Sequence, residues 1–270
     1  MPFEIITFDV QNADAFLIKT PDNKYFIIDS AKLSYKSKSS TAKLVIIKYL
    51  KDRGIKNIEG MILTHFDLDH AGGAVDLLEN LNIKTVYINS LEQKNQTVKN
   101  IFKVMKNYEI AKNNNEIYVE NNFRLKTYIA NIKDNDNENS IITLLQYKDF
   151  DMLFTGDAGV VAFEKIKRDI PHNVEVLKVG HHGAVNVVNK EMLAHLGNKV
   201  SIISTGPNTF GHPSKSTLNI LRNTNIFRTD KHNSIKITSD GKRYDVYTFD
   251  KSQKKYVLKN AYNKLRECFE

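Results

Sequence analysis

The sequence predicts an α/β fold built as a four-layer αββα sandwich, in which two β-sheets pack face to face between outer helices. Two observations lead to this prediction. Strand-like and helix-like segments alternate along two halves of the chain, separated by a polar break near residues 131–139. Each cluster of histidine and aspartate residues also follows directly on a short apolar segment, where the ends of neighbouring strands can bring side chains together. We expect one domain over residues 1–250, followed by a basic helical tail over residues 251–270.

Length and composition are those of an ordinary globular protein. The chain has 270 residues, of which 41% are hydrophobic and 26% charged, enough for one domain or two closely packed halves. No apolar run approaches the about 18 residues of a membrane span, and the first residues do not resemble a secretory signal. The single cysteine, Cys268, excludes an internal disulfide framework and a cysteine-based zinc cluster. We therefore expect a cytoplasmic protein.

The net charge of +8 favours anionic partners such as nucleic acid or phosphorylated small molecules. A basic loop over residues 34–40 and the basic tail are candidate contacts. An equally good explanation is that a chain rich in Lys, Asn and Ile reflects AT-rich coding sequence. Both explanations stay open at this point.

The first half is predicted to begin with a three-stranded meander and then to alternate helices with strands. The turn Pro21-Asp22-Asn23 and the cap Ser40-Thr41 mark two of the boundaries. The expected elements are strands over 3–10, 15–19 and 24–29, a helix over 42–52, a strand over 60–63, a helix over 75–81, a strand over 85–88, a helix over 96–111, and a hairpin over 116–119 and 123–129.

The second half repeats the alternation with shorter strands. The expected elements are strands over 139–145 and 152–154, a helix over 160–168, strands over 174–179 and 199–204, a helix over 214–222, and closing strands over 227–230, 233–238 and 243–249.

The most informative stretch follows the apolar run at residues 60–63. Four metal-capable side chains, His65, Asp67, Asp69 and His70, fall within six residues. Residues two apart at the end of a strand leave the backbone on the same side, so the first three can converge, and the fourth can turn toward a second ion. A polar strand-to-helix loop capped by an aspartate is the simpler alternative, but the full pattern predicts a metal site.

This stretch resembles the signature of the metallo-β-lactamase superfamily, with Asp67 in a position where histidine is more common. The aspartate form is similar to the hydrolase domain of ComEC-type competence (DNA-uptake) proteins. Later stretches fit the same branch, in the same order: residues 153–157, 177–183, 204–208 and 211–214. The resemblance covers most of residues 1–250 and implies a metallo-β-lactamase fold.

The resemblance also implies a ligand set for two ions. His65 and Asp67 would hold the first ion, and Asp69, His70 and His181 the second, with Asp157 between them. It further implies catalytic roles for Asp69, His182 and His212, substrate contacts from Asn208, His212 and Ser214, and hydrogen-bonded support of the ligands by Asp14 and Asp29.

One departure from the family bears on the metal. No histidine lies between His70 and His172, so the family's middle histidine has no candidate at its usual place. The first site is therefore expected to be rich in oxygen ligands, which favours Mn²⁺ or Mg²⁺ over Zn²⁺ more than three imidazoles would. We expect one or two divalent ions, Zn²⁺ or Mn²⁺, with Mg²⁺ also compatible.

The leading functional hypothesis is a metal-dependent phosphodiesterase or nuclease acting on DNA or another nucleic acid through a metal-activated hydroxide. The first alternative is a hydrolase of small phosphodiesters or phosphorylcholine esters. The second is a binding or regulatory module with a degenerate metal site. The expected partner is nucleic acid or another anionic phosphodiester, with no membrane.

Overall fold

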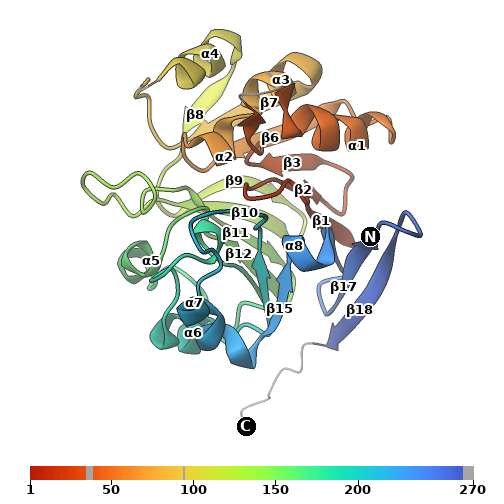
Figure 1. The fold of residues 1–270 in the computed structure, drawn as a ribbon, viewed down its shortest axis with the longest axis vertical. Helices are drawn as coiled ribbons and strands as arrows, with labels where there is room; N and C mark the ends of the chain where they lie inside the picture. Colours follow the sequence, from red (N-terminus) through yellow and green to blue (C-terminus); the bar gives the residue numbers. More distant parts are fainter. Residues whose placement is uncertain (35–38, 94, 264–270) are drawn as a thin grey trace.

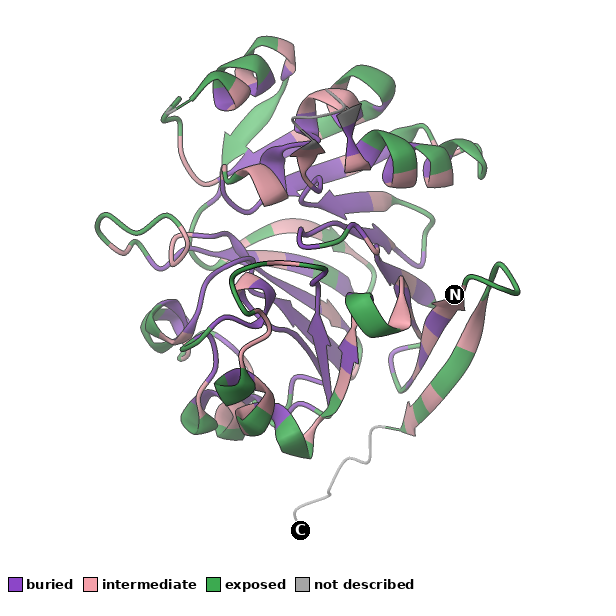
Figure 2. Cartoon of the chain, viewed as in Figure 1, coloured by how far each residue is buried: buried purple, intermediate pink, exposed green. Residues whose placement is uncertain are grey.

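The computed structural model describes residues 1–34, 39–93 and 95–263, which form two β-sheets packed face to face with helices on both outer sides (Figure 1). The strands are largely buried, whereas most of the outer helices expose one face (Figure 2). The predicted four-layer αββα sandwich is confirmed.

The first sheet combines the N-terminal strands with the C-terminal ones. Its strand order is β18-β17-β16-β1-β2-β3-β6-β7-β8. Its strands are β1 (Phe3–Thr7), β2 (Phe16–Lys19), β3 (Tyr25–Ile28), β6 (Asn57–Leu63), β7 (Asn82–Ile88), β8 (Tyr108–Ile110), β16 (Ile235–Ser239), β17 (Arg243–Asp250) and β18 (Lys255–Asn263). A small ladder of β4 (Leu33–Ser34) and β5 (Ser39–Ser40) stands apart from it.

The second sheet is formed by the middle of the chain, in the order β15-β14-β13-β12-β11-β10-β9. Its strands are β9 (Asn115–Glu120), β10 (Phe123–Tyr128), β11 (Ile142–Tyr147), β12 (Phe150–Phe154), β13 (Val176–Lys178), β14 (Val200–Ile203) and β15 (Asn225–Arg228).

Helices cover the outer face of each sheet. The first sheet carries a π-helical turn (Lys43–Ile47) that continues into α1 (Lys48–Lys51), then α2 (Leu68–Ala71), α3 (Ala74–Asn80) and α4 (Gln96–Val104). The second carries α5 (Val160–Ile166), α6 (Lys190–Leu196), α7 (Lys215–Ile220) and a 3₁₀ turn (Leu221–Asn223). The short α8 (Thr229–His232) follows β15.

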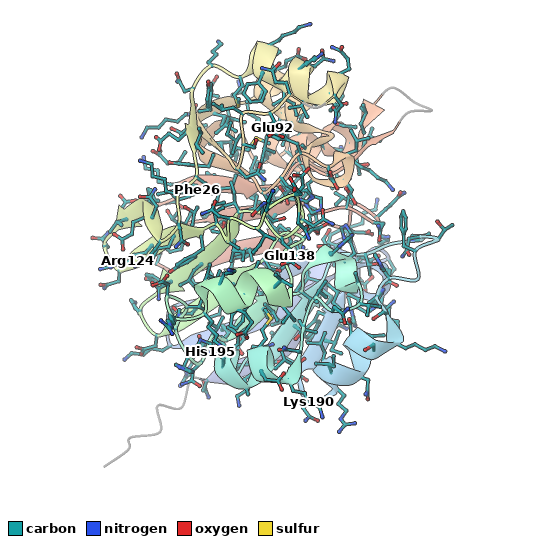
Figure 3. All side chains as sticks on the ribbon, turned by 90° about the vertical axis from the view of Figure 1, so that its left-hand side faces the viewer. Phe26, Glu92, Arg124, Glu138, Lys190 and His195 are labelled. Carbon is teal, nitrogen blue, oxygen red and sulfur yellow. The ribbon has the colours of Figure 1, made fainter. Side chains whose placement is uncertain are left out.

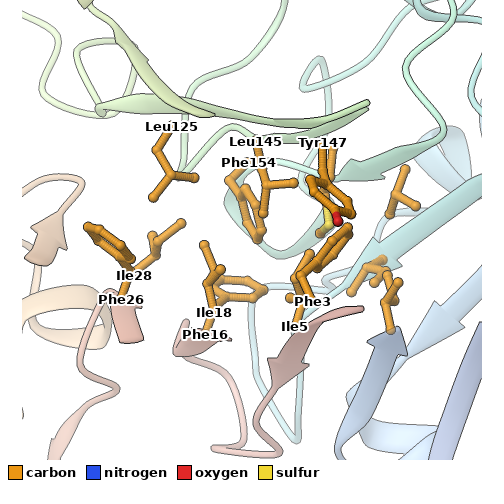
Figure 4. Close-up of a cluster of buried hydrophobic side chains, with 14 of the residues drawn as sticks. Phe3, Ile5, Phe16, Ile18, Phe26, Ile28, Leu125, Leu145, Tyr147 and Phe154 are labelled. Atoms are coloured by element: carbon orange, nitrogen blue, oxygen red, sulfur yellow. The ribbon is translucent and has the colours of Figure 1, made fainter. Parts of the chain in front are cut away.

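The central core lies between the two sheets because side chains alternate across each strand. Phe3 and Ile5 of β1 point inward, and they meet Tyr147 and other residues of the opposite sheet (Figure 4). The ring of Phe3 lies 5.6 Å from that of Tyr147 in an edge-on arrangement. The other face of β1 presents Ile6 to the cluster beneath the helices. Because both faces of such strands are buried, their sequences are nearly continuous apolar runs.

The predicted helical tail is wrong where the structure describes it. Residues 255–263 form β18, which pairs antiparallel with β17 and extends the first sheet beyond residue 250. Asp250 shapes the hairpin turn by accepting hydrogen bonds from the backbone N–H groups of Ser252 (2.8 Å) and Gln253 (3.0 Å). Tyr262 then stacks on Tyr244 with ring centroids 4.6 Å apart. Cross-strand pairing therefore overrides the helical tendency of this segment, and residues 264–270 lie outside the described part.

Two further predictions need correction. The helix expected over 96–111 ends at Val104, because residues 108–110 pair with β7 as β8. The break at residues 131–139 does not separate the sheets, since it joins β10 to β11 within the second one. Glu138 in this loop accepts hydrogen bonds from the N–H groups of Gly159 (3.1 Å) and Ala162 (2.8 Å) at the start of α5 (Figure 3). The acidic loop thus caps a helix.

Candidate metal centre

The predicted ligands lie on loops that follow parallel strands. β6 is parallel to β3 and β7, and β12, β13 and β14 are parallel to one another. The loop after β6 supplies residues 65–70, the loop after β12 supplies Asp157, and the loop after β13 supplies residues 181 and 182. Both sheets therefore contribute to one cluster of side chains.

One group of candidate ligands consists of His65, His70 and Asp157, whose ligand atoms lie within 4.8 Å of one another. The Asp157 carboxylate presents its two oxygens in different directions. Oδ1 lies 3.1 Å from His70 Nε2, and Oδ2 lies 3.8 Å from His65 Nε2. All three side chains are buried, and the arrangement suits a carboxylate that bridges two cations.

A second group consists of Asp69, His70 and His182, again with ligand atoms within 4.8 Å of one another. His182 Nε2 lies 3.2 Å from Asp69 Oδ2, and the His182 ring is almost fully buried. The geometry therefore differs from the assignment that the family resemblance implied, because His182 and not His181 accompanies Asp69 and His70.

His181 lies with the first group instead. Its Nε2 is 3.7 Å from Asp157 Oδ2, the same oxygen that faces His65. Asp67 Oδ2 lies 3.6 Å from His65 Nε2 on this side of the cluster. His181 thus brings an imidazole to the place where the sequence offered no middle histidine, and the expectation of an oxygen-rich first site is not supported. The side chains of Asp67 and His181 are 57% and 35% exposed, so they mark the open side of the centre.

Hydrogen bonds to Nδ1 of His70 and His182 orient both rings so that their Nε2 lone pairs point toward the candidate ligand groups. His70 Nδ1–H donates to Asp29 Oδ2 at 2.7 Å, and His182 Nδ1–H donates to the carbonyl oxygen of Ser204 at 2.9 Å. In each neutral ring Nε2 is then an acceptor that faces a carboxylate oxygen of Asp157 or Asp69. Two acceptors at such distances need a cation or a proton between them. The residues present therefore fit a metal ion.

The buried polar atoms support the same conclusion. His65 Nε2, His70 Nε2 and Asp157 Oδ1 are buried without an aligned hydrogen-bond partner among the described residues. Buried polar atoms are normally paired, since leaving one unpaired costs about 1–3 kcal/mol. These three are also the members of the first candidate ligand group.

Comparison with known proteins agrees with this geometry. Residues 9–98 match the family model described as the Metallo-beta-lactamase superfamily. The crystal structure of the metallo-beta-lactamase fold protein YhfI from Bacillus subtilis is similar with a TM-score of 0.59 at 10% identity, covering 87% of this chain and 100% of that one. The chain has the metallo-β-lactamase fold.

Two curated proteins are similar to this metallo-β-lactamase-fold chain in sequence. ComE operon protein 3 of Bacillus subtilis (strain 168) is 26% identical over 251 residues, which is 86% of this chain and 32% of that protein. Recombination protein 2 of Haemophilus influenzae is 27% identical over 204 residues, which is 76% of this chain and 24% of that protein. The chain thus spans about a third or a quarter of their length. The expected similarity to ComEC-type proteins is confirmed. Among the described residues, no helix is long and apolar enough to cross a bilayer.

Neighbouring charges in this metallo-β-lactamase-fold centre shift the pKa values of His70 and Asp69 in favour of their charged forms. Burial lowers the pKa of His70, but the carboxylates of Asp157 and Asp29 outweigh it and hold that pKa well above the usual value. Burial raises the pKa of Asp69, but the hydrogen bond with His182 and the charge on His70 bring it down to about 2. Without a metal ion, a proton therefore takes the place of the cation, and metal binding must displace it.

Asp29 is hydrogen-bonded to His70 and Thr64 beside the candidate ligands. Besides its bond to His70, its carboxylate accepts hydrogen bonds from the Thr64 backbone N–H at 2.8 Å and from the Thr64 hydroxyl. Thr64 Oγ1 and Ser140 Oγ in turn lie 3.2 and 3.3 Å from His65 Nδ1. The imidazoles of the first group are thereby held in one orientation.

Asp14 has a partner that our sequence analysis missed. Lys178, at the end of β13, is fully buried, and its ammonium group forms an ion pair with Asp14. It also donates to the carbonyl oxygen of Gly156 at 2.7 Å, next to Asp157. Asp14 belongs to the loop after β1, and its backbone N–H donates to the Asp69 carbonyl at 3.0 Å. Lys178 of the second sheet is therefore joined to Asp14, which follows β1 of the first sheet, beside the candidate metal centre. In the sequence, a lysine inside an apolar strand just before His181 and His182 could have indicated this buried ion pair.

Hydrogen bonds of its own side chains hold the loop after β14 together. Asn208 donates to the carbonyl oxygens of Gly206 (2.9 Å) and His212 (2.7 Å), and it accepts from the N–H groups of Phe210 (3.1 Å) and His212 (3.0 Å). Ser214 caps α7 by accepting from the Thr217 N–H at 3.0 Å. Asn208 and Ser214 thus make hydrogen bonds that shape this loop, and their predicted substrate contacts stay predictions.

His212 is the member of this loop that reaches the centre. Its ring lies 5.4 Å from the ring of His181. Burial, with the nearby His181 and His182, lowers the pKa of His212. The imidazole is therefore neutral near pH 7 and can accept or donate a hydrogen bond at the open side of the centre.

Proposed function

We propose that this chain is a metal-dependent phosphodiesterase that cleaves nucleic acid. The observation that carries the metal-dependent part is the convergence of His65, His70 and Asp157, whose facing atoms are buried and lack aligned partners within the described residues. Divalent cations held there would act as Lewis acids and lower the pKa of water.

The protein's own groups divide the remaining tasks. Asp157 presents one oxygen to His70 and the other to His65 and His181, so it can hold two cations at a fixed separation. Asp29 fixes the orientation of the His70 ring. His212 lies at the open side, where it can hydrogen-bond a phosphate oxygen or a leaving group of the substrate.

Three observations support nucleic acid as the substrate class. The chain carries a net charge of +8, which suits a polyanion. Its sequence resembles the hydrolase domain of ComEC-type DNA-uptake proteins, and one similar protein bears the name Recombination protein 2. The turn between β17 and β18 carries exposed lysines, Lys251, Lys254 and Lys255, close to the end of β1. There, Lys251 Nζ lies 3.2 Å from Asp9 Oδ2.

The direct test is incubation of metal-stripped protein with linear and circular, single- and double-stranded DNA and RNA, after reconstitution with Mn²⁺, Mg²⁺ or Zn²⁺. Bis-p-nitrophenyl phosphate serves as the small phosphodiester in parallel. Cleavage of nucleic acid that disappears with chelator and returns with one of these metals supports the proposal. Hydrolysis of the small ester alone would replace it with a small-molecule phosphodiesterase, and no hydrolysis of either would favour a binding module.

Alanine substitutions at His182 and His212 should separate a metal ligand from a substrate-side residue. We predict that His182→Ala weakens metal affinity by at least about 10- to 100-fold, the range for groups that only support ligands. His212→Ala should keep the metal affinity and lower kcat instead. Metal titration followed by isothermal calorimetry, combined with turnover at saturating metal, distinguishes the two. Equal metal affinity in wild type and His182→Ala would return His182 to the purely catalytic role expected from the sequence.

The salt dependence of binding should show which lysines contact the substrate. We predict that binding of single-stranded DNA to a catalytically inactive variant weakens with salt, and that Lys254→Glu/Lys255→Glu reduces the magnitude of the log–log slope by about 1.4. Both lysines are exposed in the hairpin near Asp9.

Lys56 and Lys106 provide the matched control. They line a cavity of about 750 Å³ at the amino ends of β6 and β8, on the edge opposite to the ligand loops. Fluorescence anisotropy at several salt concentrations would measure the slopes. A larger effect of Lys56→Glu/Lys106→Glu than of the hairpin variant would move the contact surface to that opposite edge.

A further inference from the structure

An exposed aromatic ring lies beside the open side of the metal centre. Phe210 is 74% exposed, and its ring is stacked on that of His212 with centroids 5.8 Å apart and planes 30° apart. His212 in turn lies against His181, which faces the Asp157 carboxylate. The phenyl ring is therefore the outermost member of a row of rings that leads to the candidate ligands.

The loop that carries Phe210 is fixed on both sides. Asn208 bonds to the backbone before, at and after Phe210, and one of these bonds is to the Phe210 N–H. Gly206 packs so closely against the loop after β1 that a Cβ there would lie 2.6 Å from Gln11 Cα. The backbone that carries the ring is thus held by bonds within the loop and by its packing against the loop after β1.

We infer that Phe210 is a stacking platform for a nucleobase next to the scissile phosphate, and that the substrate is single-stranded nucleic acid or a single-stranded end. The inference rests on the proposed function, because it takes the metal centre as the place of cleavage. Base–aromatic stacking needs a base whose face is free, which a single strand offers and an intact duplex does not. An aromatic face accepts any base, so the platform implies little sequence preference.

The first test uses two substrates with the same leaving group. Thymidine 5′-(p-nitrophenyl phosphate) carries a base, and methyl p-nitrophenyl phosphate does not. Phe210→Ala is expected to lower the ratio of their kcat/KM values by roughly 5- to 150-fold. Phe210→Trp should keep the ratio, and Phe210→Leu, which keeps apolar bulk without an aromatic face, should lose most of it. Tyr108→Ala, at an exposed aromatic residue on the edge strand β8, is the control and should leave the ratio unchanged.

The second test does not depend on hydrolysis. Binding of fluorescein-labelled (dT)₆ is compared with that of an abasic hexamer of equal charge, at constant Mn²⁺ and salt. The wild type should bind (dT)₆ more tightly, and Phe210→Ala should remove this difference while leaving abasic binding unchanged. That result without any hydrolysis would support the platform and refute the proposed enzyme.

The inference would be overturned if Phe210→Ala weakened both oligomers equally, or if the wild type bound both with the same affinity. A base preference that survives in Phe210→Ala would also overturn it, since another group would then read the base. Circular dichroism of each variant confirms folding, which is expected because the Phe210 ring is exposed.

Discussion

Replacing Asp157 with alanine is expected to abolish metal-dependent hydrolysis, with a loss of kcat/KM well beyond about 100-fold. This carboxylate faces His70 with one oxygen, at 3.1 Å, and both His65 and His181 with the other. Its removal therefore takes a negative charge from both candidate cation positions at once. Metal content per chain, measured by elemental analysis after dialysis, should fall together with turnover.

The matched control is Asp52→Asn, which removes an exposed carboxylate from a surface pair with Lys48. It should change neither metal content nor turnover. Asp157→Asn adds information, because the amide keeps the shape and loses the charge. If Asp157→Ala kept full activity after metal stripping and reconstitution, Asp157 would not be a ligand and the centre would have to be reassigned.

Breaking the buried ion pair between Lys178 and Asp14 should have the largest effect on stability. We predict that Lys178→Met lowers the free energy of unfolding by about 3–5 kcal/mol, because it leaves the Asp14 carboxylate buried without its cation. Both side chains are fully buried. The measurement is urea denaturation of metal-free protein, so that loss of metal does not contribute to the difference.

A double substitution separates this electrostatic cause from loss of packing. Lys178→Met combined with Asp14→Asn removes both charges and should recover a large part of the lost stability. The comparison pair is Lys84 and Glu59 on the surface, where Lys84 is 71% exposed and its replacement by methionine should cost at most about 1 kcal/mol. A similar small cost for Lys178→Met would show that water reaches Asp14 in solution.

The sequence was sufficient for those features that depend on local pattern. Apolar runs predicted the buried strands, and the polar residues that follow β6 and β12 predicted where candidate ligands lie close together. The family resemblance named His65, His70 and Asp157 as parts of one ligand set, and their ligand atoms lie within 4.8 Å of one another. The hairpin predicted over 116–119 and 123–129 is likewise present as β9 and β10.

Other features depend on contacts that no local pattern contains. His181 and His182 are adjacent, and which of them joins Asp69 depends on the backbone, where both have a positive φ (45° and 51°). Residues 255–263 form a strand only because β17 offers an edge to pair with. Lys178 is buried because Asp14 approaches it from the other sheet. For Lys178 the deciding partner, Asp14, is distant in the sequence and belongs to the other sheet.

The position of β1 in the first sheet has a consequence for how the chain folds during synthesis. β1 lies between β2 and β16, and the backbone N–H of Asp9 just beyond it bonds to Ser234, 225 residues away. Contacts over such separations form slowly, since a long loop must close first. A nascent chain that ends before residue 235 already contains every candidate metal ligand, but β1 still has an open edge. Until β16 arrives, that edge is open to pairing with other chains, so we expect aggregation during translation to be a hazard for this fold.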